Sequence, residues 1–247
     1  MSIKIIEPDW PAPSNIKAVS TTRHGGVSQG CYASLNLGTH VGDDSQSVAA
    51  NRRCLCQQLG ISSSPVWLEQ VHGTQVLELT GKEDVVEQAD ASVTNKPGVV
   101  CTVMTADCLP VVFCSQGGDR VGVAHAGWRG LAAGVLEATV EAMNVPANEL
   151  LAWFGPAIGA KAFEVGDEVR QAFIDNQPFA ETAFQRNNND RWFADIYMLA
   201  WQRLDRLGVA SVSGGDRCTY FEKDDFFSYR RDGVTGRMAT LVWIENK

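Results

Sequence analysis

Residues 99–125 read VVCTVMTADCLPVVFCSQGGDRVGVAH, and this stretch decides the fold. Within it, short apolar runs at 99–104, 111–114 and 121–125 alternate with segments that contain Asp, Pro or Gly. Short runs rich in β-branched residues and bounded by turn-forming residues are typical of buried strands. The connections between these runs are too short for a crossover helix, so we do not expect strict βαβ winding.

Strand-like and helix-like patterns alternate outside this stretch as well. Further strands are predicted at residues 3–6, 16–22, 66–71, 150–154 and 238–244, and helices at 45–59, 130–143, 166–176 and 194–207. The first of these helices has Ser45 or Ser47 as a candidate N-cap and Gly60 just past its end. Because no linker-like boundary interrupts the alternation, we predict one α/β domain with a mixed sheet over residues 1–247.

The composition is that of a globular protein, with 45% hydrophobic and 20% charged residues. A net charge of −8 repels the phosphate backbone and argues against nucleic-acid partners. No apolar run reaches the roughly 18 residues of a membrane span, and the first ten residues lack a signal-peptide core. The seven cysteines are irregularly spaced, so we expect reduced thiols in a cytoplasmic protein. An acidic chain of this size is expected to be a monomer.

Three reactive side chains follow buried strands at the points where those strands end. His72 follows the 66–71 run, Cys108 lies between two runs, and His125 ends a third. Two imidazoles and one thiolate are a natural ligand set for a catalytic zinc ion, which keeps one position open. The alternative is that both histidines are hydrogen-bonded strand-end residues and that the cysteine packs as a small apolar side chain.

Basic residues near glycines are candidates for anion binding. Arg23 begins the turn RHGG, in which glycines allow backbone N–H groups to converge. Arg129 precedes a predicted helix start, where the helix dipole favours an anion. The remaining histidines, His24 and His40, are expected to be exposed loop residues.

Short motifs occur in order along nearly the whole chain. They are TTRHGGVS (21–28), SLNLG (34–38), QVHG (70–73), ADCLP (106–110), HAGWRG (125–130), GPAIG (155–159), FEVG (163–166) and FSYRRD (227–232). Together they resemble the YfiH-like family, which carries the label laccase domain or polyphenol oxidase.

The resemblance implies an α/β/α sandwich related in fold to certain cysteine hydrolases. It also implies a zinc site made by His72, Cys108 and His125. The implied activity is phosphorolysis of adenosine, inosine and methylthioadenosine, with adenosine deamination beside it, so purine nucleosides and phosphate are the expected partners. Some members are linked to the editing of peptidoglycan precursors.

The oxidase label can be tested by counting histidines. A multicopper laccase needs a blue-copper site with two histidines and a further cluster with many more. The chain has four histidines in all, which cannot supply both sites. Copper remains an alternative metal for the single Cys-containing site, because copper binds more tightly than zinc in the general affinity order.

Roles for further residues follow from the nucleoside chemistry as hypotheses. Arg23 and Arg129 would hold phosphate with the zinc, and Asn36 would bind the sugar or base. Asp107 or Glu164 would handle the proton in deamination.

Two other classes of function stay open at this point. If no metal binds, Cys108 with His125 or His72 is a nucleophile–base pair for amide or ester cleavage. A non-enzymatic alternative makes the metal structural and the chain a partner-binding module.

Overall fold

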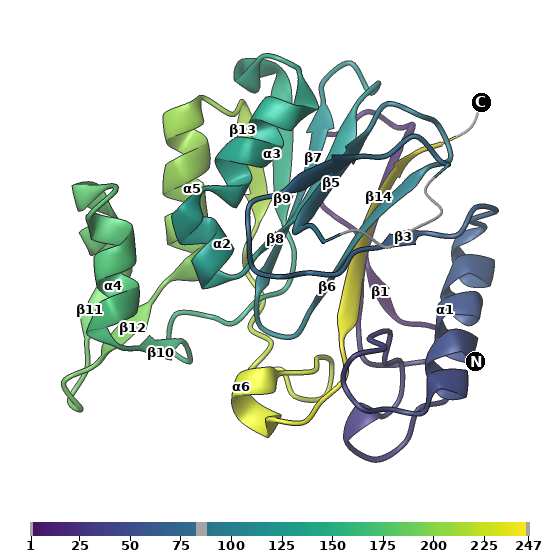
Figure 1. Ribbon diagram of the computed structural model, residues 1–247, viewed down its shortest axis with the longest axis horizontal. Helices are drawn as coiled ribbons and strands as arrows, with labels where there is room; N and C mark the ends of the chain where they lie inside the picture. The colour runs from purple at the N-terminus through teal and green to yellow at the C-terminus, as the bar shows by residue number, and fades with distance from the viewer. Residues whose placement is uncertain (1, 83–87, 246–247) are drawn as a thin grey trace.

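Two β-sheets lie face to face in the computed structural model, which describes residues 2–82 and 88–245 (Figure 1). One sheet has the strand order β1 (Ile5–Ile6), β2 (Ile16–Thr21), β14 (Met238–Ile244), β6 (Val100–Thr105) and β3 (Val66–Trp67). The other has the order β13 (Ser211–Gly214), β9 (Leu150–Phe154), β7 (Leu109–Ser115), β8 (Val121–Ala126), β5 (Ala91–Thr94) and β4 (Val76–Glu78). The predicted span 1–247 also includes residues 1, 83–87 and 246–247, which lie outside the described part.

The chain crosses from one sheet to the other between β6 and β7. The crossing is the short turn that contains Asp107 and Cys108. Asp107 has a φ of 93°, a left-handed conformation that Asp adopts more readily than bulky residues do. This turn therefore places Cys108 at an edge shared by both sheets.

The space between the sheets is filled by apolar side chains from both. Val103, Val112, Val123 and Trp153 belong to this cluster and are at most 5% exposed. All residues of β6, β7 and β8 are buried, because each of these strands is covered on both faces. This explains the nearly continuous apolar runs in the sequence.

Helices cover the outer faces of the two sheets. The helix α1 (Ser45–Leu59) packs Leu55 against Val100 and Leu241 of the five-stranded sheet. On the far side, α2 (Trp128–Ala133), α3 (Val135–Met143) and α5 (Ile196–Leu207) share a core with the six-stranded sheet. The layers are thus helix, sheet, sheet, helix.

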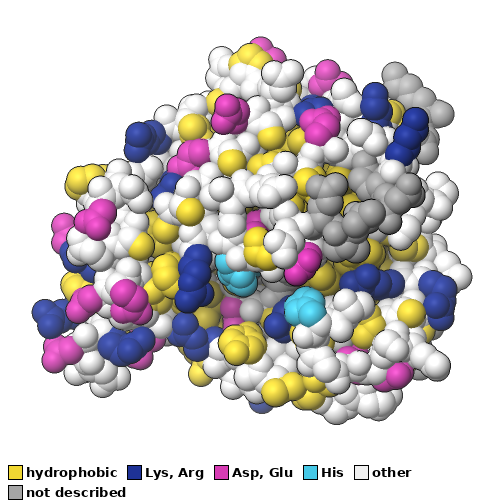
Figure 2. All heavy atoms as spheres, viewed as in Figure 1, with side chains coloured by type: hydrophobic (Ala, Val, Ile, Leu, Met, Phe, Trp, Pro, Cys, Tyr) yellow, Lys and Arg dark blue, Asp and Glu magenta, His cyan; other side chains and the backbone are white. Residues whose placement is uncertain are grey.

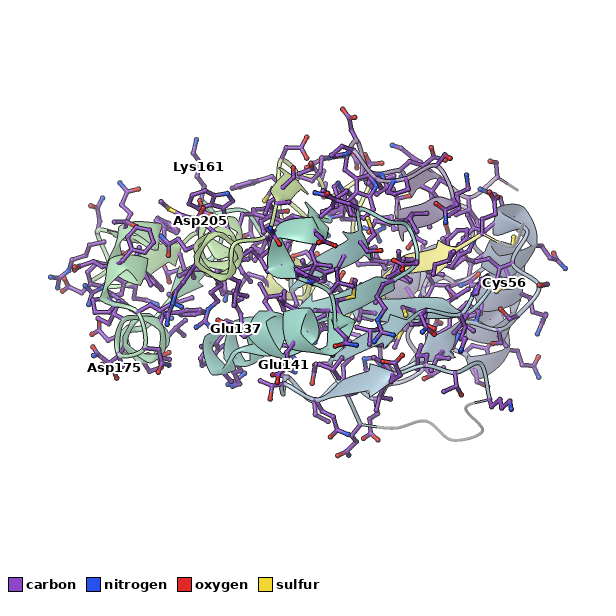
Figure 3. All side chains as sticks on the ribbon, turned by 90° about the horizontal axis from the view of Figure 1, so that it is seen from above. Cys56, Glu137, Glu141, Lys161, Asp175 and Asp205 are labelled. Atoms are coloured by element: carbon purple, nitrogen blue, oxygen red, sulfur yellow. The ribbon has the colours of Figure 1, made fainter. Side chains whose placement is uncertain are left out.

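Smaller elements extend the protein away from α1. A sheet with the order β10 (Glu164–Val165), β12 (Trp192–Ala194) and β11 (Phe184–Arg186) lies beside α4 (Asp167–Ile174). Figure 3 shows Asp175, just after α4, and Cys56 of α1 at opposite ends of the view. The remaining elements are the helix α6 (Tyr229–Asp232) and the 3₁₀ turns η1 (Gly30–Tyr32), η2 (Ala147–Glu149) and η3 (Pro178–Ala183).

The α/β class is confirmed, and several details differ from the prediction. The strands form separate sheets instead of one mixed sheet, so the sandwich has an extra β layer. The predicted 130–143 helix is divided at Gly134, whose φ of 104° is incompatible with a continuous helix. The N-cap of α1 is Asp44, whose carboxylate accepts a hydrogen bond from the Ser47 backbone, and not Ser45 or Ser47. None of the helices in the described part has the length and apolar character needed to cross a bilayer.

Candidate metal centre

His72, Cys108 and His125 lie together at the edge where the two sheets meet. Their candidate ligand atoms are all within 4.8 Å of one another, and Cys108 Sγ is 3.8 Å from His72 Nε2. The two imidazole rings are nearly perpendicular, with centroids 4.8 Å apart. In the β7–β8 ladder His125 pairs with Pro110, two residues beyond Cys108. Strand pairing therefore brings Cys108 and His125 together, whereas His72 lies outside the strands.

A fully buried carboxylate, Asp90, organises two of these three side chains. Its oxygens accept hydrogen bonds from the backbone N–H groups of Val71, His72 and Gly73, at 3.1, 2.9 and 2.6 Å. Asp90 Oδ1 also lies 2.7 Å from Nδ1 of His125. A carboxylate bound to one imidazole nitrogen fixes the ring and leaves the other nitrogen for a ligand. The sequence analysis did not find Asp90.

The backbone around His72 is held in an uncommon conformation. His72 has a φ of 60°, in the left-handed region. The three N–H bonds to Asp90 hold this turn in place and direct the His72 side chain to Cys108. Local strain of this kind concentrates at functional sites.

Gly127 closes the cluster on a third side. A Cβ at this position would lie 2.7 Å from His72 Cδ2 and 3.1 Å from Cys108 Sγ. Only a residue without a side chain allows the backbone to approach so closely. Close packing against His72 and Cys108 therefore explains why the first glycine of the HAGWRG motif is needed, which the sequence alone does not reveal.

The electrostatics of the cluster favour an ionised thiol. Burial opposes ionisation of Cys108, but the neighbouring His125 and His72 outweigh it and lower the pKa of the thiol to about 6. Burial likewise opposes a charged imidazole, yet Cys108 and Asp90 raise the pKa of His125 to about 9. Thiolate is the form of cysteine that binds metals and acts as a nucleophile.

The donor set fits a catalytic metal ion. One thiolate and two imidazoles match zinc, and they also match the softer ligand preference of copper. His125 is 3% exposed, Cys108 is half-buried and His72 is exposed, so the cluster opens to solvent on one side. In the described residues this is the only cluster of three or more His, Cys, Asp or Glu side chains with such convergent ligand atoms.

Asp107 lies next to the cluster but has an internal role. Its carboxylate accepts hydrogen bonds from Thr219 Oγ1 at 2.6 Å and from the Arg230 backbone N–H at 2.7 Å. With 8% exposure it joins the Cys108 turn to the start of α6. These contacts support positioning of Cys108 better than the expected transfer of a proton.

Glu164 lies in the small sheet, away from the Cys108 turn in the chain. Its carboxylate contacts Arg191 Nε at 3.0 Å and Asn187 Nδ2 at 2.7 Å. Arg230 Nη1 donates to the Glu164 carbonyl and so links this sheet to α6. The carboxylate is committed to these partners, so nothing here supports the expected proton transfer.

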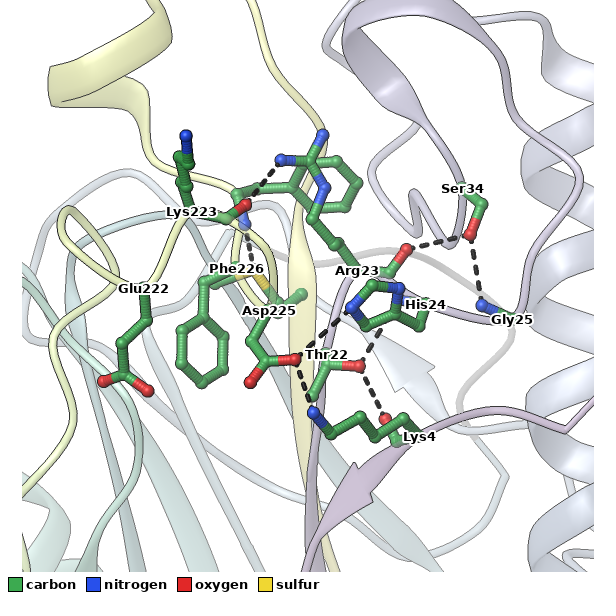
Figure 4. A network of polar contacts seen from close by, with 12 residues as sticks. Lys4, Thr22, Arg23, His24, Gly25, Ser34, Glu222, Lys223, Asp225 and Phe226 are labelled. Carbon is green, nitrogen blue, oxygen red and sulfur yellow. Dashed lines mark hydrogen bonds and ion pairs between the residues drawn. The ribbon is translucent and has the colours of Figure 1, made fainter.

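Arg23 holds two loops together. Its guanidinium donates to the carbonyls of Ala33 and Lys223 and lies 4.7 Å from the Phe227 ring centroid. Figure 4 shows Arg23 between the loop that carries Ser34 and the segment that carries Lys223. These contacts give Arg23 a structural role, and its contact with phosphate stays a prediction.

Asn36, the residue predicted to bind the sugar or base, is fully buried. Its Oδ1 accepts from the backbone N–H groups of Gly38 and Arg237, both at 2.9 Å. Its Nδ2 donates to the Gly38 carbonyl and to Asp43. Both polar atoms of the side chain therefore have internal partners, which favour a structural role in holding the loop before Gly38.

The remaining candidates are exposed. Arg129 is exposed at the start of α2 and stacks over Trp128, with Cζ 4.5 Å from the ring centroid. His24 and His40 are exposed, as expected, and His24 Nε2 lies 3.3 Å from Asp225. Neither histidine belongs to the metal cluster.

The fold and the site define a class of protein: a two-sheet α/β protein with an open His–Cys–His cluster oriented by a buried carboxylate. The family model described as multi-copper polyphenol oxidoreductase laccase matches residues 17–245. The chain therefore belongs to this laccase-like YfiH family, and the resemblance in its motifs is confirmed.

Relatives of high similarity cover almost the entire chain. Purine nucleoside phosphorylase YfiH of Escherichia coli K12 is 55% identical over 241 residues, which span 98% of this chain and 99% of that protein. Purine nucleoside phosphorylase PA4543 of Pseudomonas aeruginosa is 54% identical, with 98% of each chain covered. A crystal structure from Neisseria meningitidis is 52% identical and has a TM-score of 0.95, with 98% of this chain and 99% of that chain covered.

Proposed function

We propose that this protein is a zinc-dependent purine nucleoside phosphorylase that cleaves adenosine, inosine and methylthioadenosine and also deaminates adenosine. The observation that carries the proposal is the convergence of His72, Cys108 and His125 within 4.8 Å on a solvent-facing edge. The names of the two relatives above, which match over nearly their full length, support the substrate class.

Phosphorolysis defines what the site must accomplish. A phosphate oxygen forms a bond to C1′ of the ribose while the bond from C1′ to N9 of the base breaks. The electron pair of that bond goes to the base, which takes up a proton, and ribose 1-phosphate is the second product. A zinc ion bound by the cluster would supply Lewis-acid chemistry at this site.

The protein's own residues would prepare the cluster for this chemistry. Asp90 contacts Nδ1 of His125 at 2.7 Å, which orients the ring so that Nε2 would be the nitrogen that binds a metal ion. The turn around Asp107 holds Cys108, whose low pKa keeps it as a thiolate at neutral pH. Gly127 leaves room for the three ligands to approach. Each contact reduces the rearrangement that binding would otherwise require.

Elemental analysis combined with product detection tests the proposal. We expect about one zinc per purified chain, and adenine with ribose 1-phosphate from adenosine when phosphate is present. Inosine formed without phosphate would report deamination. Cys108→Ala should abolish metal binding and both products. Failure to form either product with zinc fully bound would contradict the proposal.

A second candidate function rests on a specific observation. Cys108 and His125 form a thiolate–imidazolium pair whose imidazole contacts Asp90, an arrangement suited to nucleophilic cleavage of amides or esters. Editing of a peptidoglycan precursor would fall in this class. In that case activity should survive chelation and disappear on thiol alkylation, whereas nucleoside turnover should disappear on chelation.

A further inference from the structure

Two arginines and one histidine gather around one loop on the α1 side of the His72–Cys108–His125 cluster. They are Arg52 of α1, Arg237 just before β14, and His40, which lies three residues after Leu37 in the loop that precedes α1. None of them was a candidate for ligand binding in the sequence. Figure 2 shows histidine side chains around a hollow near the centre of one face, with Lys and Arg side chains beside them.

Leu37 connects the two arginines directly. Arg52 Nε and Nη2 donate to the Leu37 carbonyl at 2.9 and 2.8 Å. The Leu37 N–H donates to the Arg237 carbonyl at 3.1 Å. At Gly38 an added Cβ would lie 2.8 Å from Arg237 Cγ, so the loop packs tightly on this side chain. The same short segment therefore holds the guanidinium of Arg52 and packs against the backbone and the aliphatic part of Arg237.

The strand register places this group beside the metal cluster. Met238 pairs with Thr105 at the end of β6, so Arg237 lies level with the turn that leads to Cys108. On the other side, Arg52 Nη2 is 3.7 Å from the sulfur of Met104.

Met104 in turn connects to the His72 turn. Its backbone exchanges two hydrogen bonds with the side chain of Gln70, at 2.7 and 2.8 Å, and Gln70 is two residues before His72. Arg237 thus lies near the Cys108 turn, and Arg52 is connected through Met104 and Gln70 to the segment that leads to His72.

Neither arginine forms an ion pair within the described residues, although the charges of Cys108 and Asp107 act on Arg237 and raise its pKa against the effect of burial. Among residues 2–82 and 88–245, no ion pair includes Arg52, Arg237 or His40. Burial lowers the pKa of Arg52 to about 10 and also lowers the pKa of Arg237. Burial and the charges of both arginines lower the pKa of His40. Keeping like charges together in a half-buried place is unfavourable unless an anion joins them.

Donor atoms are available for such an anion. Within the described residues, Arg237 uses Nη1 for the carbonyls of Thr235 and Gly236, and Arg52 uses Nε and Nη2 for Leu37. Nε and Nη2 of Arg237 and Nη1 of Arg52 make no hydrogen bond to that part of the chain. Arginine presents such donors in a planar fork that matches phosphate oxygens.

We propose that Arg52, Arg237 and His40 form the phosphate-binding site of this enzyme, at the border of the His72–Cys108–His125 cluster. This assignment rests on the proposed phosphorolysis for its catalytic meaning, while the anion site itself rests on the contacts above. We assign phosphate binding to this site in preference to Arg23, whose guanidinium donates to backbone carbonyls. The exposed Arg129 is the alternative phosphate-binding residue.

Titration of inorganic phosphate into the metal-loaded protein tests the site. Arg237→Gln and Arg52→Gln should each weaken phosphate binding at least tenfold. His40→Gln, which disturbs no hydrogen bond of the described chain, should weaken it less. Arg53→Gln is the matched control, because Arg53 is the exposed neighbour of Arg52 on α1 and the charge change is the same. Arg237→Lys and Arg52→Lys retain the charge and should recover part of the affinity if the fold is intact.

Kinetics separate this site from a general structural effect. The KM for phosphate should rise at least tenfold in Arg237→Gln, while the KM for adenosine changes less, and Arg53→Gln should keep both KM values at their native levels. Native protein that binds no phosphate, or glutamine variants that bind it as tightly as the native protein, would overturn the proposal. So would a loss that occurs in Arg129→Gln instead. Phosphate binding that depends on Arg237 without any phosphorolysis would support the anion site and contradict only the proposed function.

Discussion

Asp90→Asn removes the charge that joins the two histidine segments while keeping the size of the side chain. Oδ2 of Asp90 serves Val71 and Gly73, and Oδ1 serves His72 and His125. Whichever oxygen becomes an amide nitrogen, two of these donors lose their acceptor. At about 1–3 kcal/mol for each, the fold loses about 2–6 kcal/mol. Loss of a carboxylate behind a metal-bound histidine weakens metal affinity by about 10–100-fold.

The assay is zinc affinity measured by competition with a chromophoric chelator, together with thermal melting of the metal-free protein. Zinc affinity should fall by at least about tenfold, and the melting temperature by roughly 4 °C or more. Asp119→Asn is the control, because it makes the same charge change at an exposed turn residue bonded to Ser115. A folded Asp90→Asn protein with native zinc affinity would refute the idea that Asp90 orients His125.

The remaining predictions concern the thiol, the glycine beside it and the core. In metal-free protein the lowered pKa means that Cys108 stays a thiolate as pH falls, until pH drops through about 6. Its iodoacetamide reaction, measured against Cys108→Ala, should therefore be half-maximal near that pH, and a midpoint near 9 would contradict the assigned pKa. Gly127→Ala should reduce zinc content several-fold, because its Cβ meets His72 Cδ2 at 2.7 Å. Unchanged zinc would show that the backbone has room. Leu55→Ala should cost about 2–5 kcal/mol in urea unfolding, since Leu55 is fully buried between α1 and the five-stranded sheet.

The sequence predicted the bounds of an element correctly where a capping residue or a glycine next to the element determines where it ends. The helix α1 has the predicted bounds because Gly60 adopts a left-handed conformation that terminates it. The division of 130–143 at Gly134 was missed because the apolar stripe continues through the glycine. The strand β5 was missed because ASVT is short and half polar, and it is buried by pairing with β8 and β4. Tertiary pairing, which no local pattern contains, decides such segments.

The site shows the same limit at the level of side chains. The metal-binding candidates were recognisable because reactive residues at strand ends are unusual and few. Asp90 was not, because its partners are mostly backbone N–H groups supplied by a turn that leaves no mark in the sequence. The contact of Asn36 with the Arg237 backbone could not be read from the sequence, because the two residues lie 201 positions apart. Arg52 and Arg237 belong to opposite ends of the chain, so only the fold brings them to one loop.

The two candidate chemistries of Cys108 exclude each other at any moment. A thiolate that is bound to a metal ion has its lone pair committed and cannot attack a carbonyl carbon. Removing the metal should therefore lower nucleoside turnover and raise the reactivity of the Cys108 thiolate, because the freed thiol has a pKa of about 6. The open face of the cluster, with His72 exposed, gives a substrate access in either state. Nucleoside turnover and the rate of Cys108 alkylation can be measured together during chelation. If turnover falls while alkylation becomes faster, the site is that of a metal enzyme. If amide or ester cleavage survives chelation and is lost only after alkylation, the site is that of a cysteine hydrolase.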